Sequence, residues 1–197
     1  MDTPLHTQPG IPASPYKPLS ESDVKSIEEA AYEILAKSGM AIHTPTGFEA
    51  LKAAGAEVDE ETRIVKMSRS MVEDAIDSNP SSITLHSRDD EYDAVLEKDR
   101  VHYGTGGTAI YVMDPDTGER RPSTVNDIIL NARMVQELEN VHVFTINVFP
   151  NDVESKQHID VNRFFHSLDN TTKHVMGGVY SLEGSKNVVK MAEMLAG

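Results

Sequence analysis

The 197-residue sequence contains no cysteine, which excludes disulfide bonds and thiolate metal sites within the chain. It also contains no apolar run approaching about 18 residues, the length that a transmembrane helix needs. Residues 1–18 lack the charged and apolar regions of a secretory signal. We therefore expect a cytoplasmic protein that makes no use of a membrane.

Basic residues are scarce, with 18 Lys and Arg against 32 Asp and Glu, which gives a formal net charge of −14. An acidic surface repels phosphate groups, so a nucleic-acid partner and an anionic membrane surface are disfavoured. A weak preference for a cationic ligand is compatible with this charge, but solubility is its simplest role.

Proline is concentrated at the start of the chain, where five of the ten prolines fall within residues 1–18. This composition predicts an extended, disordered arm, with wrapping around a partner subunit as the alternative. Residues 19–98 then favour an α-rich cap with small hairpins. Its helices are expected over residues 21–38, 45–54 and 68–78, with a hairpin between the last two.

Residues 99–197 alternate between strand and helix patterns. Val141–Phe149 is almost continuously apolar and β-branched, which is typical of a parallel strand buried on both faces. A second such strand is expected over residues 173–179. Helices are expected over residues 124–138, 154–168 and 181–195. The pattern predicts an α/β fold, and both a doubly wound sheet and a (β/α)8 barrel begin in this way.

A glycine-rich stretch is the strongest sign of a ligand site. Gly104, Gly106 and Gly107 follow a short strand and precede another strand rather than a helix. No Lys-Ser/Thr follows them, so an ordinary phosphate-binding loop is disfavoured. The alternative is a glycine-rich turn or bulge without a ligand. Under the first interpretation, the candidate substrate-binding residues are Gly104, Thr105, Gly106, Gly107 and Thr108.

Four further residues are candidates for the same site. Tyr103 and Tyr111 flank the glycines and are able to form part of a cage for a cation, although half-buried packing explains such tyrosines equally simply. Asn147, in a buried strand, needs a hydrogen-bond partner, which is either a ligand or an internal network. Phe149 follows it, either at the mouth of a pocket or in the core.

Other polar residues give weaker signals. The histidines show no spacing typical of a metal site, so we expect no metal ligands in this chain. Arg120 and Arg121 suit a carboxylate-bearing substrate, but a solvated pair after a turn is the simpler interpretation. No general acid or base stands out, so the catalytic residues stay unknown.

Several stretches together resemble the trimethylamine:corrinoid methyltransferase family, including its glycine betaine branch without pyrrolysine. They are Thr105-Gly-Gly-Thr-Ala109, the following Tyr111, Asp114-Pro-Asp-Thr-Gly-Glu-Arg-Arg-Pro-Ser-Thr124, Ile34-Leu-Ala-Lys-Ser-Gly39, Leu51-Lys-Ala-Ala-Gly-Ala-Glu-Val-Asp59, Asn79-Pro80 and Asp169-Asn-Thr-Thr-Lys173. The resemblance covers about residues 19–197 and does not specify the substrate.

The resemblance implies that residues 99–197 form the first βα units of an incomplete (β/α)8 TIM barrel, preceded by the helical and hairpin cap. It also implies methyl transfer from trimethylamine or a betaine to the cob(I)alamin of a partner corrinoid protein. The corrinoid is then supplied by that partner, no cofactor is bound directly by this chain, and the full-length protein is expected to be a homo-oligomer. The alternatives are a truncated, non-catalytic fragment and a binding module for methylated amines.

Overall fold

The computed structural model describes residues 7–8, 10–12 and 16–196. The chain divides into two compact units, Ser14–Pro80 (the N-terminal unit) and Met1–Ala13 with Ser81–Gly197 (the C-terminal unit). This division falls where the sequence pattern changes from helical to strand-like. The finer boundaries at residues 18 and 98 stay predictions.

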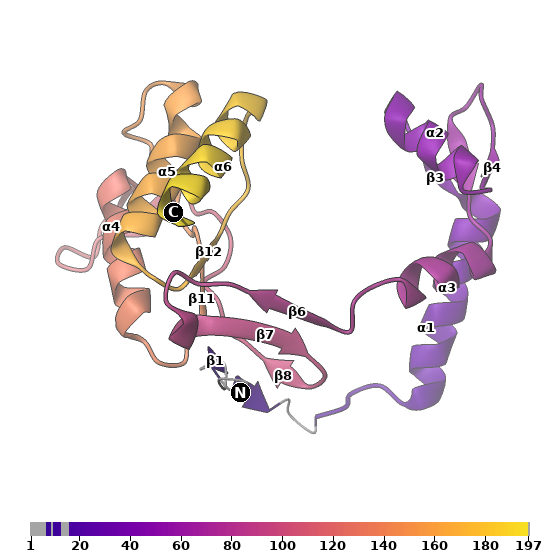
Figure 1. Cartoon of the computed structure of the whole chain (residues 1–197), viewed down its shortest axis with the longest axis horizontal. Coiled ribbons are helices and arrows are strands. Elements are labelled where there is room, and N and C mark those ends of the chain that lie inside the picture. Colours follow the sequence, from indigo (N-terminus) through magenta and orange to yellow (C-terminus); the bar gives the residue numbers. More distant parts are fainter. Residues whose placement is uncertain (1–6, 9, 13–15, 197) are drawn as a thin grey trace. The chain divides into compact units, whose positions relative to one another are not determined.

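The N-terminal unit consists of helices around a small antiparallel sheet with the strand order β3-β5-β4 (Figure 1). Its helix α1 starts with a capping box between Ser20 and Asp23. Gly39 ends the helical stretch with φ 70°, and a Cβ there would lie 2.5 Å from the carbonyl oxygen of Val65. The elements are α1 (Glu21–Glu33), the π-helix η1 (Ile34–Ser38), β3 (Met40–Ala41), α2 (Pro45–Ala53), β4 (Glu57–Val58), β5 (Ile64–Lys66) and α3 (Arg69–Asp77).

The core of this unit is small and centres on Phe48 and Val65, both fully buried. The apolar stripe of α1, by contrast, is not covered within its unit. No residue of α1 is buried, and Val24 and Ile27 are more than half exposed. The helical stretch reaches the sheet only at its end, where Met67 N–H donates to the carbonyl oxygen of Leu35.

The C-terminal unit begins with an antiparallel pair, β6 (Ser82–Leu85) and β7 (Asp93–Glu97), joined through the 3-10 helix η2 (Asp90–Tyr92). Two stretches of the proline-rich arm add to this region. β1 (Thr7–Gln8) pairs with β7 in parallel, and β2 (Ile11–Pro12) pairs with β8 (Arg100–Val101). Parts of the arm expected to be disordered therefore form strands, while residues 1–6, 9 and 13–15 lie outside the described residues.

Next comes a hairpin of β9 (Tyr111–Met113) and β10 (Arg120–Pro122). Its turn is closed by the N–H of Gly118, which donates to the carbonyl oxygen of Asp114 at 2.8 Å. Gly118 has φ 71°, a conformation that favours glycine. The turn has the sequence Asp-Pro-Asp-Thr-Gly, a composition typical of turns.

The remainder is a βα repeat of α4 (Val125–Glu137), β11 (Val143–Thr145), α5 (Lys156–Asn170), β12 (His174–Met176) and α6 (Leu182–Ala196). β11 and β12 are parallel, and the glycine-rich segment lies on the other side of β11. α5 contacts both α4 and α6 (Figure 1). The regular strand β11 is shorter than the predicted Val141–Phe149, although one further bridge forms at Val148.

The core of the C-terminal unit lies between these helices and β11. Phe144, Ile146 and Val148 point the same way, as the two-residue period of an extended chain requires, and pack on α4 and α5. The buried cluster consists of Ile128, Ala132, Val135, Phe144, Ile146, Val148 and Phe164. This cluster packs against one face of the strands. Polar contacts hold the strand ends in place.

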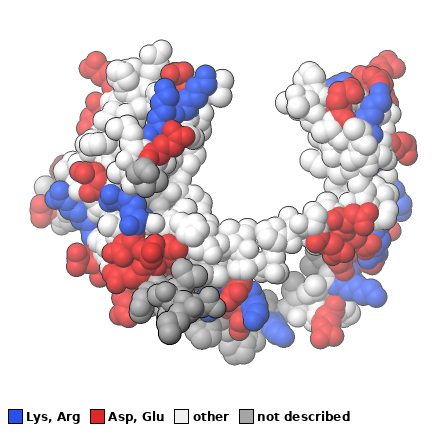
Figure 2. Space-filling view, in the orientation of Figure 1, with Lys and Arg blue, Asp and Glu red and all other residues white. Residues whose placement is uncertain are grey.

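The fold is mixed α/β, as predicted, with sheets of two or three strands. The described residues form no closed barrel, so the barrel fragment implied by the resemblance stays a prediction. On the face shown in Figure 2, acidic and basic side chains are interspersed over both units. Within residues 7–8, 10–12 and 16–196, no helix is long and apolar enough to cross a membrane.

Candidate functional site

The glycine-rich segment runs parallel to β11 and its extension. Gly104 pairs with Val143, and Ala109 pairs with Val148. An extended chain rises about 3.3 Å per residue, so these two pairs are roughly 16 Å apart. The candidate residues of this segment are therefore spread along the strand, from its amino end to its carboxyl end.

Tyr103 and Gly104 lie beside the amino end of β11. The N–H of Tyr103 donates to His142 Nδ1 at 3.0 Å, and the Tyr103 side chain is exposed. A Cβ at Gly104 would lie 3.1 Å from the carbonyl oxygen of Val143, so glycine permits the two chains to approach closely. Thr105 uses its hydroxyl group to bond the carbonyl oxygen of Thr145 at 2.5 Å.

Gly106, Gly107 and Thr108 form the exposed middle of the segment. A Cβ placed on Gly106 or Gly107 would meet no atom within 4 Å in the described chain. Gly107 has φ 59°, so its conformation favours glycine, whereas Gly106 needs no such explanation. The backbone at Gly106 is accordingly open to a ligand.

The ring of Tyr111 makes a cation–π contact with Arg120. The guanidinium carbon of Arg120 lies 3.7 Å from the ring centroid, across the β9–β10 hairpin. Tyr111 follows the carboxyl-end pair of Ala109, while Tyr103 precedes the amino-end pair of Gly104. The two tyrosines therefore flank opposite ends of the segment and are not brought together as two walls of one cage.

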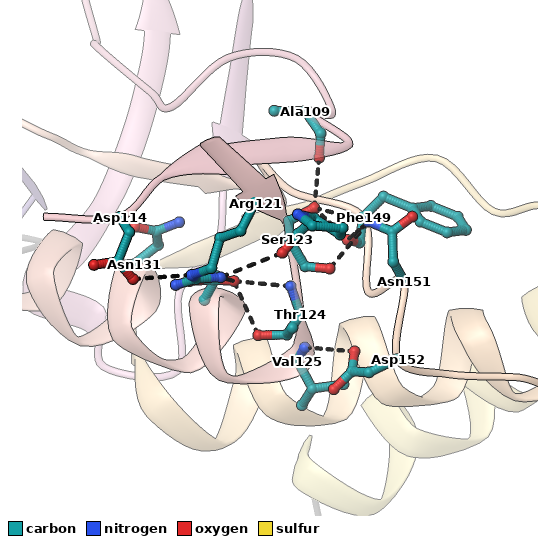
Figure 3. Close-up of polar contacts among 12 residues, drawn as sticks. Ala109, Asp114, Arg121, Ser123, Thr124, Val125, Asn131, Phe149, Asn151 and Asp152 are labelled. Atoms are coloured by element: carbon teal, nitrogen blue, oxygen red, sulfur yellow. Dashed lines mark hydrogen bonds and ion pairs between the residues drawn. The ribbon is translucent and has the colours of Figure 1, made fainter. Parts of the chain in front are cut away.

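A polar cluster ties three chain segments together at the carboxyl end of these strands (Figure 3). The buried Ser123 donates from its hydroxyl group toward two carbonyl oxygens, that of Ala109 at 3.1 Å and that of Phe149 at 2.6 Å. Asn151 Nδ2 donates to the carbonyl oxygens of Ile110 at 2.9 Å and Ser123 at 3.0 Å. We call Ser123 and Asn151 the carboxyl-end clamp, because they hold the end of the glycine-rich segment against the end of β11.

Arg121 extends this cluster to the start of α4. Its guanidinium group donates to both carboxylate oxygens of Asp127 at 2.8 Å and to Asp114 at 3.0 Å. Arg121 holds the pKa of Asp127 below its ordinary value, and the backbone of Thr124 acts in the same direction. A bidentate pair of this kind is geometrically specific. Arg121 therefore forms ion pairs within the protein and is not the solvated residue that the sequence suggested. The available signal was Asp127, which forms a capping box with Thr124 at the start of α4.

Asn147 finds its side-chain partner within the protein. Asn131 of α4 donates through Nδ2 to Asn147 Oδ1 at 3.2 Å, and the Asn147 carbonyl oxygen accepts from Ala109 N–H at 2.8 Å. The internal network that the sequence left as an alternative is thus present. Asn147 is only partly buried, so one of its amide faces stays accessible.

Phe149 contacts an aromatic residue that the sequence analysis did not single out. Its ring meets that of Tyr180 edge to face, with 5.8 Å between the centroids. Phe149 follows β11 and Tyr180 follows β12, so both aromatic residues come from the carboxyl ends of parallel strands. The useful signal was the position of Tyr180, four residues after the end of β12 and shortly after Gly177 and Gly178.

Two buried charges of α5 fix the loop that carries Tyr180. Asp160 is fully buried, and both its carboxylate oxygens accept from the N–H of Tyr180, at 3.1 and 3.0 Å. Arg163, 1% exposed, donates to the carbonyl oxygen of Gly178 at 2.9 Å. A Cβ on Gly184 would lie 2.0 Å from Asp160 Oδ2, so α6 starts directly over this carboxylate.

A hollow of about 470 Å³ opens beside the aromatic pair. This volume is in the range typical of sites for small molecules. The hollow lies within the C-terminal unit and is lined by Phe149, Lys156, Gln157, Ile159, Tyr180 and Ser181.

At the amino ends of β11 and β12, buried polar side chains hydrogen-bond the backbone of neighbouring segments. Lys173 donates through Nζ to three backbone carbonyl oxygens, those of Val135, Leu138 and Val141, at 2.7 to 2.8 Å. His142 is 4% exposed and accepts the N–H of Tyr103 through Nδ1, so this nitrogen carries no proton. Burial lowers the pKa of His142, and the charges of His102 and Lys173 lower it further.

We expect mild acid to destabilise the C-terminal unit through His142. Because its pKa is lower in the folded chain, the unfolded chain binds more protons just below the ordinary value of 6.5. The stability is present above pH 6.5 and is lost as pH falls toward the folded pKa, by at most about 1.4 kcal/mol per pH unit.

The measurement is the free energy of unfolding by urea between pH 7 and pH 5. His142→Asn, whose Oδ1 can accept the same N–H, should flatten this dependence. His158→Asn changes an exposed histidine and serves as the control. Equal slopes for the parent protein and His142→Asn would contradict the expectation.

No group of three or more His, Asp or Glu that could hold a metal ion occurs among the residues that the structure describes. The functional signal therefore lies in the shape and chemistry of the carboxyl end, together with the similarity of the whole chain to known proteins. The model of one protein family, trimethylamine methyltransferase, matches residues 4–197. The chain belongs to the trimethylamine methyltransferase family.

Three relatives illustrate the range of this family. Trimethylamine methyltransferase MttB of Desulfitobacterium hafniense (strain DSM 10664 / DCB-2) is 32% identical over 178 residues, 90% of this chain and 36% of the relative. The protein of the same name from Methanosarcina thermophila is 31% identical over 158 residues, 79% of this chain and 33% of the relative. The glycine betaine methyltransferase of Desulfitobacterium hafniense (strain Y51) is 28% identical over 186 residues, 92% of this chain and 37% of the relative.

The resemblance found in the sequence is thereby confirmed at the level of the trimethylamine methyltransferase family. The chain spans about a third of the length of these curated relatives. Since relatives in this family carry the names of two different substrates, membership does not decide between a trimethylamine and a betaine substrate. That choice depends on the residues of the site.

Proposed function

We propose that this chain is part of a methyltransferase that moves a methyl group from a methylated or quaternary amine to the cob(I)alamin of a partner corrinoid protein. The observation that carries the proposal is family membership over nearly the whole chain. The names of the relatives, trimethylamine methyltransferase and glycine betaine methyltransferase, support both substrate types.

We further propose that the glycine-rich segment, β11 and β12 are the first three parallel strands of a (β/α)8 barrel. Parallel pairing on both sides of β11 supports this arrangement, and so does the strand–helix alternation through α4, α5 and α6. In such barrels the active site forms at the carboxyl ends of the strands. The corresponding end here carries Ala109, Phe149 and Tyr180.

The reaction breaks a C–N bond and forms a C–Co bond. The reduced cobalt of the partner's corrinoid would supply the electron pair for the new bond to the methyl group, and the nitrogen would keep the pair of the broken C–N bond. A quaternary ammonium leaves as a neutral tertiary amine, so it needs no general acid. The tasks left to the protein are to remove water from the cation and to align the methyl group for transfer.

Residues at the carboxyl end are suited to these tasks. The carboxyl-end clamp of Ser123 and Asn151 fixes Ala109 and Phe149 through backbone carbonyl groups, which limits movement of the site walls. The exposed glycines leave room for a substrate or a partner to approach the backbone. Aromatic faces such as that of Phe149 stabilise quaternary ammonium groups by about 0.5–2 kcal/mol each.

The test uses the full-length protein with its reduced corrinoid partner. The cob(I)alamin spectrum is followed while glycine betaine, other betaines and trimethylamine are added in turn. Loss of the cob(I)alamin absorption with one of them supports the reaction and names the substrate. No change with any of them, with a corrinoid protein shown to be active, would contradict the proposal.

Gly106→Val should abolish methyl transfer while leaving the fold intact. A side chain at Gly106 meets nothing within 4 Å, so the free energy of unfolding should change by less than about 0.5 kcal/mol. The valine would instead occupy the space where a ligand approaches the backbone. The measurements are methyl-transfer rate and urea unfolding, with Gly106→Ala expected to be intermediate in rate. Full activity in Gly106→Val would remove this loop from the site.

A further inference from the structure

The aromatic pair at the carboxyl end is held by buried charges rather than by loose packing. Asp160 binds the backbone of Tyr180, and Arg163 binds Gly178 two residues before it. The guanidinium carbon of Arg163 also lies 4.9 Å from the centroid of the Tyr180 ring. Because Asp160 and Arg163 are almost completely buried, the loop has a defined position before any ligand arrives.

The exposure of the two rings differs from what core packing alone would give. Tyr180 is 56% exposed and Phe149 is partly exposed, although both belong to a fixed contact. A rigid, half-exposed aromatic pair beside a hollow presents ring surface to a ligand at little cost in conformational entropy. Ring surface of this kind binds quaternary ammonium groups, whose charge is spread over methyl groups.

Lys156 favours a ligand that carries a negative charge as well as the quaternary ammonium group. This lysine lines the same hollow and is exposed, and its ammonium group makes no ion pair or hydrogen bond with any residue in the described ranges. A bare cation in the hollow would be repelled by Lys156, whereas a ligand that also carries a carboxylate would be attracted. Two unit charges about 6 Å apart in water interact by roughly 0.7 kcal/mol, which is about a threefold change in affinity.

We propose that the hollow lined by Phe149, Lys156 and Tyr180 binds a small zwitterion, with its quaternary ammonium group on the aromatic pair and its carboxylate at Lys156. Asp160 and Arg163 act as positioning residues for Tyr180. The proposal rests on the proposed function and deepens it, because it assigns the substrate class to betaines rather than to trimethylamine.

The experiment measures ligand binding to the 197-residue chain by nuclear magnetic resonance, so it does not depend on methyl transfer. The probes are glycine betaine and tetramethylammonium, at concentrations on the order of millimolar, as expected for so small a ligand. Glycine betaine should bind more tightly than tetramethylammonium. Tyr180→Leu and Phe149→Leu should each lower the affinity for both ligands about three- to tenfold.

Lys156→Met gives the sharpest result, because the two probes should respond in opposite directions. Affinity for glycine betaine should fall about threefold, and affinity for tetramethylammonium should rise. A purely structural role for Lys156 would shift both in the same direction. Lys190→Met and Phe165→Leu change an exposed lysine and an exposed phenylalanine outside the hollow and should leave both affinities unchanged.

Two outcomes would overturn the inference. One is the absence of binding of either probe to the folded parent chain. The other is an unchanged affinity for both probes in Tyr180→Leu and in Lys156→Met. Because Lys156 is exposed, the Lys156→Met variant should fold. If the full-length Lys156→Met variant transfers methyl groups with an unchanged KM for the substrate, the proposed zwitterion site is wrong and the proposed function still stands. Binding that follows the pattern above, without any methyl transfer, would do the reverse.

Discussion

Gly184→Ala should destabilise the C-terminal unit by roughly 3 kcal/mol or more, the range of severe steric changes in a core. The added Cβ would lie 2.0 Å from Asp160 Oδ2 and 2.8 Å from Asp160 Cβ, so rotating the carboxylate does not relieve the clash. Asp160 cannot move away freely, because it is fully buried and binds the N–H of Tyr180. Alanine is favoured over glycine in a helix by about 1 kcal/mol, which is too little to offset the clash. Urea unfolding followed by circular dichroism measures the change.

Gly178→Ala is the matched control, since Gly178 lies in the loop that leads into α6 and a Cβ there meets nothing within 4 Å. It should change the free energy of unfolding by less than about 0.5 kcal/mol. If Gly184→Ala were as stable as this control, α6 would not start over Asp160 as described. The positioning of Tyr180 by Asp160 would then be in doubt as well.

Lys173→Met should cost about 3 kcal/mol or more of stability, because it removes three hydrogen bonds made by one buried charged group. Methionine keeps the apolar part of the side chain but removes the ammonium donor from the carbonyl oxygens of Val135, Leu138 and Val141, of which the first two still accept a backbone N–H. Each hydrogen bond from a charged group contributes about 1.5–3 kcal/mol. An opposing effect is the cost of burying the ammonium group, which lowers the pKa of Lys173. The three hydrogen bonds that Lys173 Nζ donates, at 2.7 to 2.8 Å, should outweigh this cost.

Thermal and urea unfolding of Lys173→Met, with the exposed Lys190→Met as control, decide between these two effects. A loss confined to Lys173→Met supports the role of the ammonium group in closing α4 onto β11. A variant as stable as the parent protein, or more stable, would mean that the burial cost equals or exceeds the hydrogen bonds. In that case Lys173 would not be what fixes the amino end of the strands.

The order of helices and strands followed closely from local sequence. Ser20 with Asp23, Thr124 with Asp127 and the Asp-Pro-Asp-Thr-Gly turn each specify a chain conformation within a few residues, and each is present in the structure. Such signals are readable because capping and turn formation use neighbouring backbone groups. The local pattern did not predict which helix faces are buried, because burial depends on the elements that pack against a face. The α1 stripe has the spacing of a packed helix face, yet none of its residues is buried.

The candidate site divides in the same manner. Phe149 and the glycine-rich segment were predicted from composition and position, and they meet at the carboxyl end of β11 through the pair of Ala109 with Val148. Tyr103 and Tyr111 were candidates for one cage, with half-buried packing as the more common explanation, and the parallel register sets them at opposite ends of the segment. Arg120 then covers the Tyr111 ring across a hairpin, a contact between residues nine positions apart in the sequence.

By itself the sequence determined the family, the helix and strand order, and an acidic, cysteine-free chain with a glycine-rich strand end. Only the tertiary structure decided which residues surround one point in space. It brought Tyr180 to Phe149, placed Asp160 beneath Gly184, and closed α4 with Lys173. The physical reason is that capping and periodicity act over a few residues, whereas contacts between strand ends and between helices depend on register and packing across the fold.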